Sequence, residues 1–254
     1  MQNKNNKNVV FVVILVVSVV TSFLLGQFLE SKSISMFNYS LAQVIDINKI
    51  DNNKEIVYSG KTYIPNKLPV DLNIDEVRSE LPIINLNYDS VKSINEEINK
   101  KYNELKDDNI ITEDMVNINS VKYKYYVNDN ILSLVIEYKN YNYTAGYVSY
   151  EYKSYNIDKN NGKVLTNNEL INLKNLTNDK VYNNIVKNIE NEYEDLGYDD
   201  YKNTDFYRET INNIGKNNNI NVSLFLDADN NLSTYLNIRM NMGPGTITRN
   251  FILK

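Results

Sequence analysis

The chain has 254 residues, with 27 basic groups, 32 acidic groups and a formal net charge of −5. It contains 46 asparagines and 21 tyrosines, but no cysteine, histidine or tryptophan. These absences exclude a thiol nucleophile, a Ser-His triad, an imidazole general base, and zinc or iron sites built on thiolate or imidazole ligands. They also exclude disulfides. The mild acidity argues against a nucleic-acid partner, because such a partner requires a clustered basic face.

An uncharged apolar run, VVFVVILVVSVVTSFLLG, lies near the N-terminus at residues 9–26, and Phe28 and Leu29 extend it. Because roughly 20 apolar residues span a bilayer, we expect a transmembrane anchor over residues 9–29. Lys4 and Lys7 precede the run, so the positive-inside rule places the tail, residues 1–8, in the cytoplasm and the rest outside. Eight residues cannot bury a core, and we expect no cytoplasmic domain.

A cleavable signal peptide is the alternative for this run. The run is longer than the ~7–15 apolar residues usual in a signal peptide, and no Ala-x-Ala site follows it closely. Ser31 and Ser33 have the spacing that a signal peptidase could use, so cleavage near Ser33, giving a secreted protein, stays open. We favour an uncleaved, single-pass anchor in the cell membrane.

Residues 30–55 are polar without a sustained period and are expected to form a tether. Strands are predicted at residues 55–63 and at residues 81–87, where Pro82 suits an edge strand. A helix should begin at Asp89 or Ser90, because apolar residues then recur three or four apart. Its apolar stripe is Val91, Ile94, Ile98, Tyr102 and Leu105. Its expected water-facing residues are Asn95, Glu96, Asn99, Lys100 and Asn103.

The period then changes to two, which predicts antiparallel strands at residues 121–127, 131–140 and 147–158. Asn161-Gly162 follows as a hairpin signal. A second helix is expected from Thr177, with Val181, Ile185 and Ile189 in its stripe and Gly197 as its stop. A short helix at residues 205–214 and strands at 220–226, 232–242 and 246–253 complete the chain.

Strands and helices in separate runs indicate an α+β fold of antiparallel sheets with packed helices. We expect two small, intimate sub-domains, at residues 56–158 and 159–254, behind the anchor and tether.

The order of these segments resembles the extracytoplasmic domains of RsiV-type anti-sigma factors over residues 56–254. Three features carry the resemblance: Ile94-Asn95 with Ile98-Asn99 in the first helix, the run from Tyr155 to Leu170 (YNIDKNNGKVLTNNEL), and the hairpin Phe225–Leu232 (FLDADNNL). In that family the outer domains sense lysozyme by binding it, and similar domains accompany cell-wall deacetylases. The resemblance therefore implies a lysozyme-binding outer domain.

The chain also departs from this family. We expect no sigma-binding cytoplasmic segment, since only eight residues precede the predicted anchor, so we do not carry over anti-sigma activity. The deacetylase module is missing too, and its metal ligands could not exist without histidine. Ala145-Gly146-Tyr147 stands where many relatives have Ala-His, which removes any role of that histidine.

An acidic, tyrosine-containing segment, ENEYEDLGYDDYKNTD at residues 190–205, is the candidate partner-binding site. Its acidic groups could speed encounter with a cationic protein such as lysozyme, and its aromatic side chains could anchor it. The alternative is a solvated helix end and acidic loop, which is what charge runs usually form. The candidate contact residues are Glu190, Glu192, Tyr193, Glu194, Asp195, Tyr198, Asp199, Asp200, Tyr201 and Asp205.

The predicted meander holds ten tyrosines, which alternate between its two faces. They could form an aromatic platform for a protein or glycan, although strand propensity alone also explains them. The ten are Tyr123, Tyr125, Tyr126, Tyr138, Tyr141, Tyr143, Tyr147, Tyr150, Tyr152 and Tyr155.

Asp227-Ala-Asp229-Asn-Asn231 opens like an EF-hand loop, but the required glycine and glutamate are absent, so a polar turn is expected. We expect no metal site, no cofactor and no catalysis. A hydrolase using two carboxylates would need a cleft geometry that sequence cannot show. The sequence thus predicts a membrane-anchored extracytoplasmic binding or sensor domain for a cationic protein such as lysozyme. The alternative is a peptidoglycan- or glycan-binding wall module.

Overall fold

The computed structural model describes residues 46–65, 68, 72–216, 219–240 and 246–254. Residues Asp46–Lys254 form one compact unit. The predicted anchor, residues 9–29, and most of the predicted tether lie outside the described residues. Within the described part, no helix is both long enough and apolar enough to cross a membrane. The division into sub-domains at residue 158 stays a prediction.

The fold is α+β, as predicted, and its sheets are antiparallel. A four-stranded sheet has the order β3-β4-β5-β6, and a three-stranded sheet has the order β11-β10-β9. Two short sheets, β1-β2 and β7-β8, accompany them. The strands are β1 (Val57–Tyr63), β2 (Ser79–Ile84), β3 (Ile110–Ile111), β4 (Val116–Asn128), β5 (Ile131–Asn142), β6 (Tyr147–Asp158), β7 (Gly215–Lys216), β8 (Asn219–Ile220), β9 (Leu224–Leu226), β10 (Leu232–Arg239) and β11 (Thr246–Leu253).

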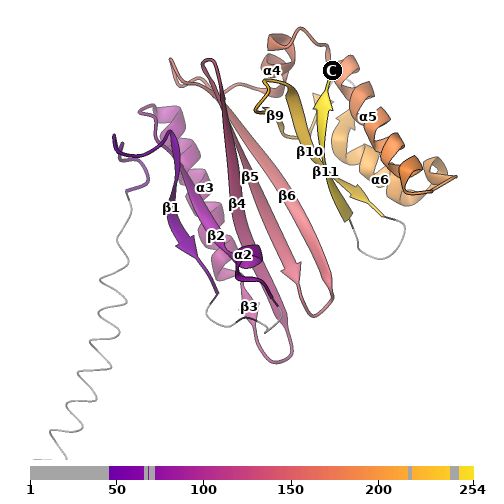
Figure 1. Cartoon of the computed structure of the whole chain (residues 1–254), viewed down its shortest axis with the longest axis horizontal. Helices are drawn as coiled ribbons and strands as arrows, with labels where there is room; N and C mark the ends of the chain where they lie inside the picture. Colours follow the sequence, from indigo (N-terminus) through magenta and orange to yellow (C-terminus); the bar gives the residue numbers. More distant parts are fainter. Residues whose placement is uncertain (1–45, 66–67, 69–71, 217–218, 241–245) are drawn as a thin grey trace, which may run out of the picture. The chain divides into compact units, whose positions relative to one another are not determined.

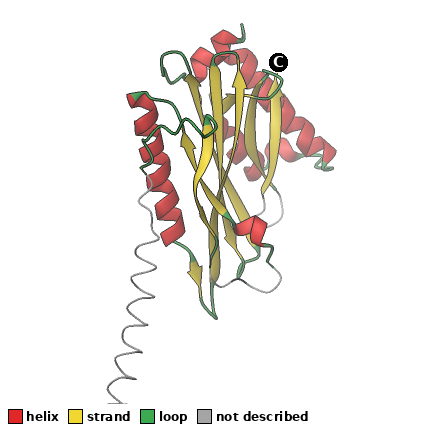
Figure 2. Ribbon diagram, turned by 60° about the vertical axis from the view of Figure 1, so that its left-hand side comes forward, coloured by secondary structure: helices red, strands yellow, loops and turns green. Residues whose placement is uncertain are grey.

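The helices pack on the sheets as separate layers (Figures 1 and 2). Helix α3 lies beside the long strands, and α5 and α6 lie beside β10 and β11. The helices are α2 (Ile74–Val77), α3 (Asp89–Asp107), α4 (Asn167–Leu173), α5 (Asn178–Asp195), the 3-10 turn η1 (Tyr201–Asn203) and α6 (Asp205–Ile214).

The period-two pattern of β4, β5 and β6 sorts their side chains between the two faces of the sheet. On β5, Leu132, Leu134 and Ile136 are fully buried on the face that also carries Tyr138. Helix α3 covers this face, because its Lys101 lies over the Tyr138 ring and its Glu97 pairs with Lys153 of β6. The opposite face carries Lys122, Glu137 and Tyr152, which are cross-strand neighbours in one row.

Asn95 of α3 was expected to face water, and this expectation is wrong. Its side chain is only 2% exposed. Its Oδ1 accepts a hydrogen bond from the Ile84 N–H at 2.9 Å, and its Nδ2 donates to the carbonyls of Ile84 and Ile47 at 3.0 Å each. The amide thus acts as a short strand partner at the end of β2. This explains an asparagine next to the apolar stripe.

A second core lies between α5, α6 and the β9–β11 sheet. The predicted stripe residues Val181, Ile185 and Ile189 are buried there in one apolar cluster that also contains Leu236 and Ile238 of β10. Thr177 caps α5 by accepting from the Lys180 N–H, and Gly197 follows the helix with a positive φ of 77°. Both boundaries agree with the predicted capping signals.

Helices α2 and α4 were not predicted from the sequence. Helix α4 had a readable signal, because Thr166 and Glu169 form a capping box at its start. Lys163 also pairs with Glu169, and these partners lower the pKa of the Glu169 carboxyl to about 2. Helix α2 is a single turn and carries no comparable pattern.

Buried polar side chains join β9 to the β4–β6 sheet. Asn156 of β6 donates to the Leu224 carbonyl at 2.8 Å and accepts from the Ser133 hydroxyl at 2.7 Å. The Ser133 oxygen in turn accepts from the Leu226 N–H at 3.1 Å. Because all these groups are removed from water, the network fixes how the two sheets meet.

Candidate functional site

The predicted acidic segment spans the end of α5, the turn after it, η1 and the start of α6. Its tyrosines do not share one environment. Tyr193 is completely buried, and Tyr201 is 4% exposed. Only Tyr198 is partly exposed. Leu196, two residues before it, is 39% exposed. Tyr193 and Tyr201, predicted to touch a partner, therefore support this surface from beneath.

Tyr193 is the centre of an aromatic cluster. Its hydroxyl donates to the Arg239 carbonyl at 2.9 Å and lies 3.0 Å from the Thr210 hydroxyl. Its ring contacts four others with centroids 5.3–6.1 Å away, those of Tyr198, Tyr201, Phe206 and Tyr207. Such a cluster fixes the ends of α5 and α6 relative to each other.

Three of the seven acidic residues of the segment are paired with cations. Glu190 contacts Lys202 at 2.9 Å and also accepts from the Tyr207 hydroxyl. Glu192 accepts from Arg249 at 2.7 Å, and Asp205 pairs with Arg208 at 2.7 Å. The pKa of Lys202 is raised, chiefly by its hydrogen bond to Glu190. These three carboxylates stabilise the fold locally and are less available to a partner.

The other four carboxylates form no salt bridge within the described residues, although Lys202 is close enough to interact electrostatically with Glu194. Glu194 accepts from the Tyr201 hydroxyl at 3.1 Å, and Asp200 accepts from Asn203. Three of the four line an open pocket of about 470 Å³, whose lining residues are Glu194, Tyr198, Asp199, Asp200, Tyr201, Lys202 and Asn203. We call the exposed part of this surface the acidic face. It consists of Glu194, Asp195, Leu196, Tyr198, Asp199 and Asp200.

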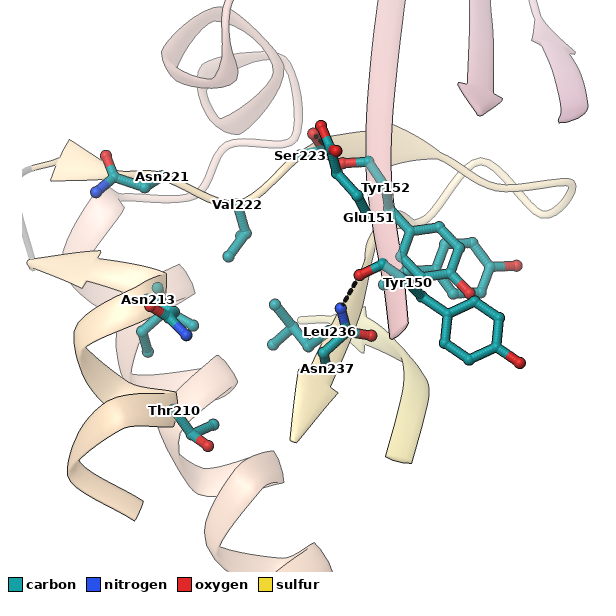
Figure 3. Close-up of a pocket in the computed structure, with 12 residues that line it drawn as sticks. Tyr150, Glu151, Tyr152, Thr210, Asn213, Asn221, Val222, Ser223, Leu236 and Asn237 are labelled. Carbon is teal, nitrogen blue, oxygen red and sulfur yellow. Dashed lines mark hydrogen bonds between the residues drawn. The ribbon is translucent and has the colours of Figure 1, made fainter. Parts of the chain in front are cut away.

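The ten tyrosines of the meander are divided between the two faces of the sheet. Tyr138 and Tyr155 are buried beneath α3. Tyr126, Tyr150 and Tyr152 point the other way, toward β9 and β10. Close to this interface lies a cavity of about 240 Å³ between β6, β10 and α6 (Figure 3). In Figure 3 the Tyr150 and Tyr152 rings project to the opposite side of β6 from Thr210 and Asn213.

A groove lies along the face of the sheet that carries Tyr150 and Tyr152. Two adjoining hollows, of about 150 and 510 Å³, share Lys122, Glu137 and Tyr152. The larger one also reaches β11, where it is lined by Thr246, Ile247, Thr248 and Arg249. We call this region the tyrosine groove. Residues of its wall are Lys122, Glu137, Lys139, Tyr150, Tyr152, Thr246, Thr248 and Arg249.

The EF-hand-like turn is closed by its own hydrogen bonds. The Asp227 carboxylate accepts from the N–H groups of Asp229 and Asn231 and from the Ser233 hydroxyl, at 2.9–3.0 Å. Over the described ranges, no three acidic side chains come close enough together to hold a metal ion. The polar residues of this turn are therefore explained by the hydrogen bonds that close it.

In comparisons with known proteins, no family model, no curated protein and no solved structure matches this chain.

Proposed function

We propose that this protein is a membrane-anchored, extracytoplasmic binding or sensor protein without catalysis, and that its acidic face recognises a cationic protein such as lysozyme. One observation carries the proposal. Glu194, Asp199 and Asp200 line a pocket, and none of them, nor the neighbouring Asp195, forms a salt bridge in the described part of the chain, whereas Glu190, Glu192 and Asp205 do. Unpaired carboxylates keep their charge available to a positive partner.

The acidic face also offers apolar contact. Leu196 and Tyr198 lie between Asp195 and Asp199 in the chain, so apolar and charged groups adjoin. Protein interfaces typically combine such a contact with a polar rim. The buried cluster around Tyr193 holds the surrounding backbone in place, which reduces the entropy lost when a partner binds.

Lysozyme as the partner, and the extracytoplasmic position, rest on the resemblance to RsiV-type outer domains and on the apolar run at residues 9–29. Both are part of the proposal. Charge complementarity chiefly raises the association rate, and salt screens it over about 8 Å at physiological ionic strength. Binding should therefore weaken as salt rises.

A titration of the full-length chain in detergent solution with lysozyme tests the proposal. The variant Asp195→Asn, Asp199→Asn, Asp200→Asn should weaken the affinity about tenfold, or about 1.4 kcal/mol, mostly by slowing association. The matched control is Asp107→Asn, Glu113→Gln, Asp114→Asn, which removes three exposed charges from the other half of the unit and should leave the affinity within twofold. Absence of binding at low salt, or equal losses in both variants, would contradict the proposal.

A further inference from the structure

The tyrosine groove is a second surface, chemically opposite to the acidic face. Its floor is one face of the β4–β5–β6 sheet, where Lys122, Glu137 and Tyr152 form one cross-strand row. Lys139 and Tyr150 belong to the next row. The row of Lys124 flanks the Tyr152 row on its other side. The two outer rows are four residues apart along a strand, so at a rise of ~3.3 Å per residue the floor extends over about 13 Å. Strand β11 supplies one wall.

Five aromatic rings form a column beside this floor. Tyr152 stacks on Tyr150 and on Tyr235, with centroids 6.3 and 4.8 Å apart. Phe225 stacks on Tyr235 and Tyr126, at 5.4 and 5.8 Å. All four interplanar angles are 17° or less. Tyr150 ends the column beside the larger hollow, so among the described residues it has an aromatic neighbour on one face only.

The groove has an excess of positive charge, although the whole chain is acidic. Lys122 has no ion-pair or hydrogen-bond partner among the described residues, and its side chain is exposed. Lys139 contacts Glu76 at 3.7 Å, and Arg249 is paired with Glu192. Glu137 is the one carboxylate lining the two hollows, and it accepts from the Tyr152 hydroxyl at 2.9 Å.

The remaining groups of the groove are hydroxyls and aromatic rings. The Thr248 hydroxyl donates to the side-chain Oδ1 of Asn237 at 2.8 Å, and the Thr246 hydroxyl oxygen is buried with no hydrogen-bond partner among the described residues. A flat ring at the edge of a hollow, with a hydroxyl and a carboxylate nearby, suits a pyranose, which has apolar C–H faces and a rim of hydroxyl groups. An unpaired lysine at the edge adds a preference for a negatively charged substituent.

We propose that the tyrosine groove binds an oligosaccharide whose sugars carry carboxylate groups. One sugar ring packs on the Tyr150 ring, its hydroxyls contact Glu137 and Thr248, and a carboxylate contacts Lys122. Both muramic acid and uronic acid polymers have this chemistry. The site does not depend on the proposed function, because it shares no residue with the acidic face and selects the opposite charge.

Binding of defined saccharides to the full-length chain, measured by calorimetry in detergent solution, tests this assignment. The probes are a tetrasaccharide of alternating N-acetylglucosamine and N-acetylmuramic acid, tetragalacturonate, and chitotetraose, which lacks carboxylates. At least one carboxylated probe should bind about tenfold more tightly than chitotetraose. The carboxylated probe that binds more tightly shows whether the groove recognises a muramic acid or a uronic acid polymer. No saturable binding of either carboxylated probe, or equal binding of chitotetraose, would overturn the proposal.

Variants locate the site. Lys122→Gln, at an exposed and unpaired side chain, should weaken the carboxylated probe about fivefold and leave chitotetraose unchanged. Tyr150→Ala should weaken all saccharides about tenfold, whereas Tyr150→Phe, which keeps the ring, should bind within twofold of the original. Lys180→Gln and Tyr147→Ala, outside the groove, are the controls.

Two outcomes would count against a saccharide site even if binding is seen. The first is a hexaglutamate peptide that binds as tightly as the carboxylated saccharides, which would indicate a general anion site. The second is an equal loss of affinity in Lys122→Gln and Lys180→Gln. The acidic-face triple variant should retain full saccharide binding, so failure of lysozyme binding and failure of the groove are distinguishable.

Discussion

At the scale of single residues, asparagine has two different roles on α3. Asn95 satisfies the backbone N–H and carbonyl of Ile84, while the Oδ1 of Asn99, one turn later, is buried with no hydrogen-bond partner in the described part of the chain. A high asparagine content therefore includes a few residues on which the fold depends. The contacts of each side-chain amide in the structure show which asparagines these are.

This contrast gives the first prediction. Asn95→Ala should lower the free energy of unfolding by about 3 kcal/mol, because it leaves two buried backbone groups of Ile84 unsatisfied. Asn99→Ala loses no hydrogen bond and gains helix propensity, so its effect should stay within about 0.5 kcal/mol or be stabilising. Urea denaturation followed by circular dichroism measures both. Similar losses in the two variants would show that the Asn95 contacts contribute little.

At the scale of elements, the turn after β6 positions the start of α3. The Tyr88 hydroxyl donates to the Lys159 carbonyl at 2.9 Å, and the Ser90 hydroxyl donates to the Gly162 carbonyl at 2.5 Å. Gly162 has a φ of +73°, and a Cβ there would lie 2.3 Å from Tyr88 Cγ. The Asn-Gly signal in the sequence thus marks both a turn and a close helix contact.

The second prediction compares two glycines. Gly162→Ala should cost about 3 kcal/mol or more, because the clash with the Tyr88 ring adds to the strain of a positive φ. Gly146→Ala is the control, since its φ is +67° and nothing lies within 4 Å of the added Cβ. It should cost only about 1 kcal/mol. Thermal or urea unfolding measures both, and equal costs would mean that the turn and α3 are not tightly coupled.

At the scale of the whole molecule, the tyrosine excess determines the response to alkali. Burial raises the pKa of Tyr102 and of Tyr123 to about 12. It also raises the pKa values of Tyr138, Tyr152 and Tyr155. An unfolded tyrosine titrates near pH 10. The folded state therefore holds these protons more tightly than the unfolded state.

The sign of this linkage gives the third prediction. The stabilisation is fully present below about pH 10 and is lost as the pH rises toward the folded values of about 12. We expect cooperative unfolding between about pH 10 and 12, with tyrosinate absorbance rising together with the loss of circular dichroism. Tyr102→Phe removes a titrating hydroxyl that has no hydrogen-bond partner among the described residues, so the midpoint of this variant should move to higher pH. Full tyrosine ionisation with the circular dichroism unchanged would contradict the prediction.

Local patterns in the sequence were sufficient for most elements. The alternation in β4–β6, the stripe of α5 with its Thr177 cap, and the bounds of α6 and β11 depend on residues close together in the chain, and the α+β class follows from their order. The acidity of residues 190–205 is also a property of the sequence alone. The pairing of Glu190 with Lys202 and of Glu192 with Arg249 is not.

Only the tertiary structure decided which of these side chains are free. Tyr193 and Tyr198 lie five residues apart in one acidic segment, yet the first is buried and the second is partly exposed, because α6 packs over one side of the turn. The aromatic column likewise combines β4, β6, β9 and β10, which no local pattern relates. Composition determined that this chain has no thiol or imidazole chemistry. The packing of distant strands and helices determined where its carboxylates and aromatic rings can meet a ligand, because burial depends on contacts that are far apart in the sequence.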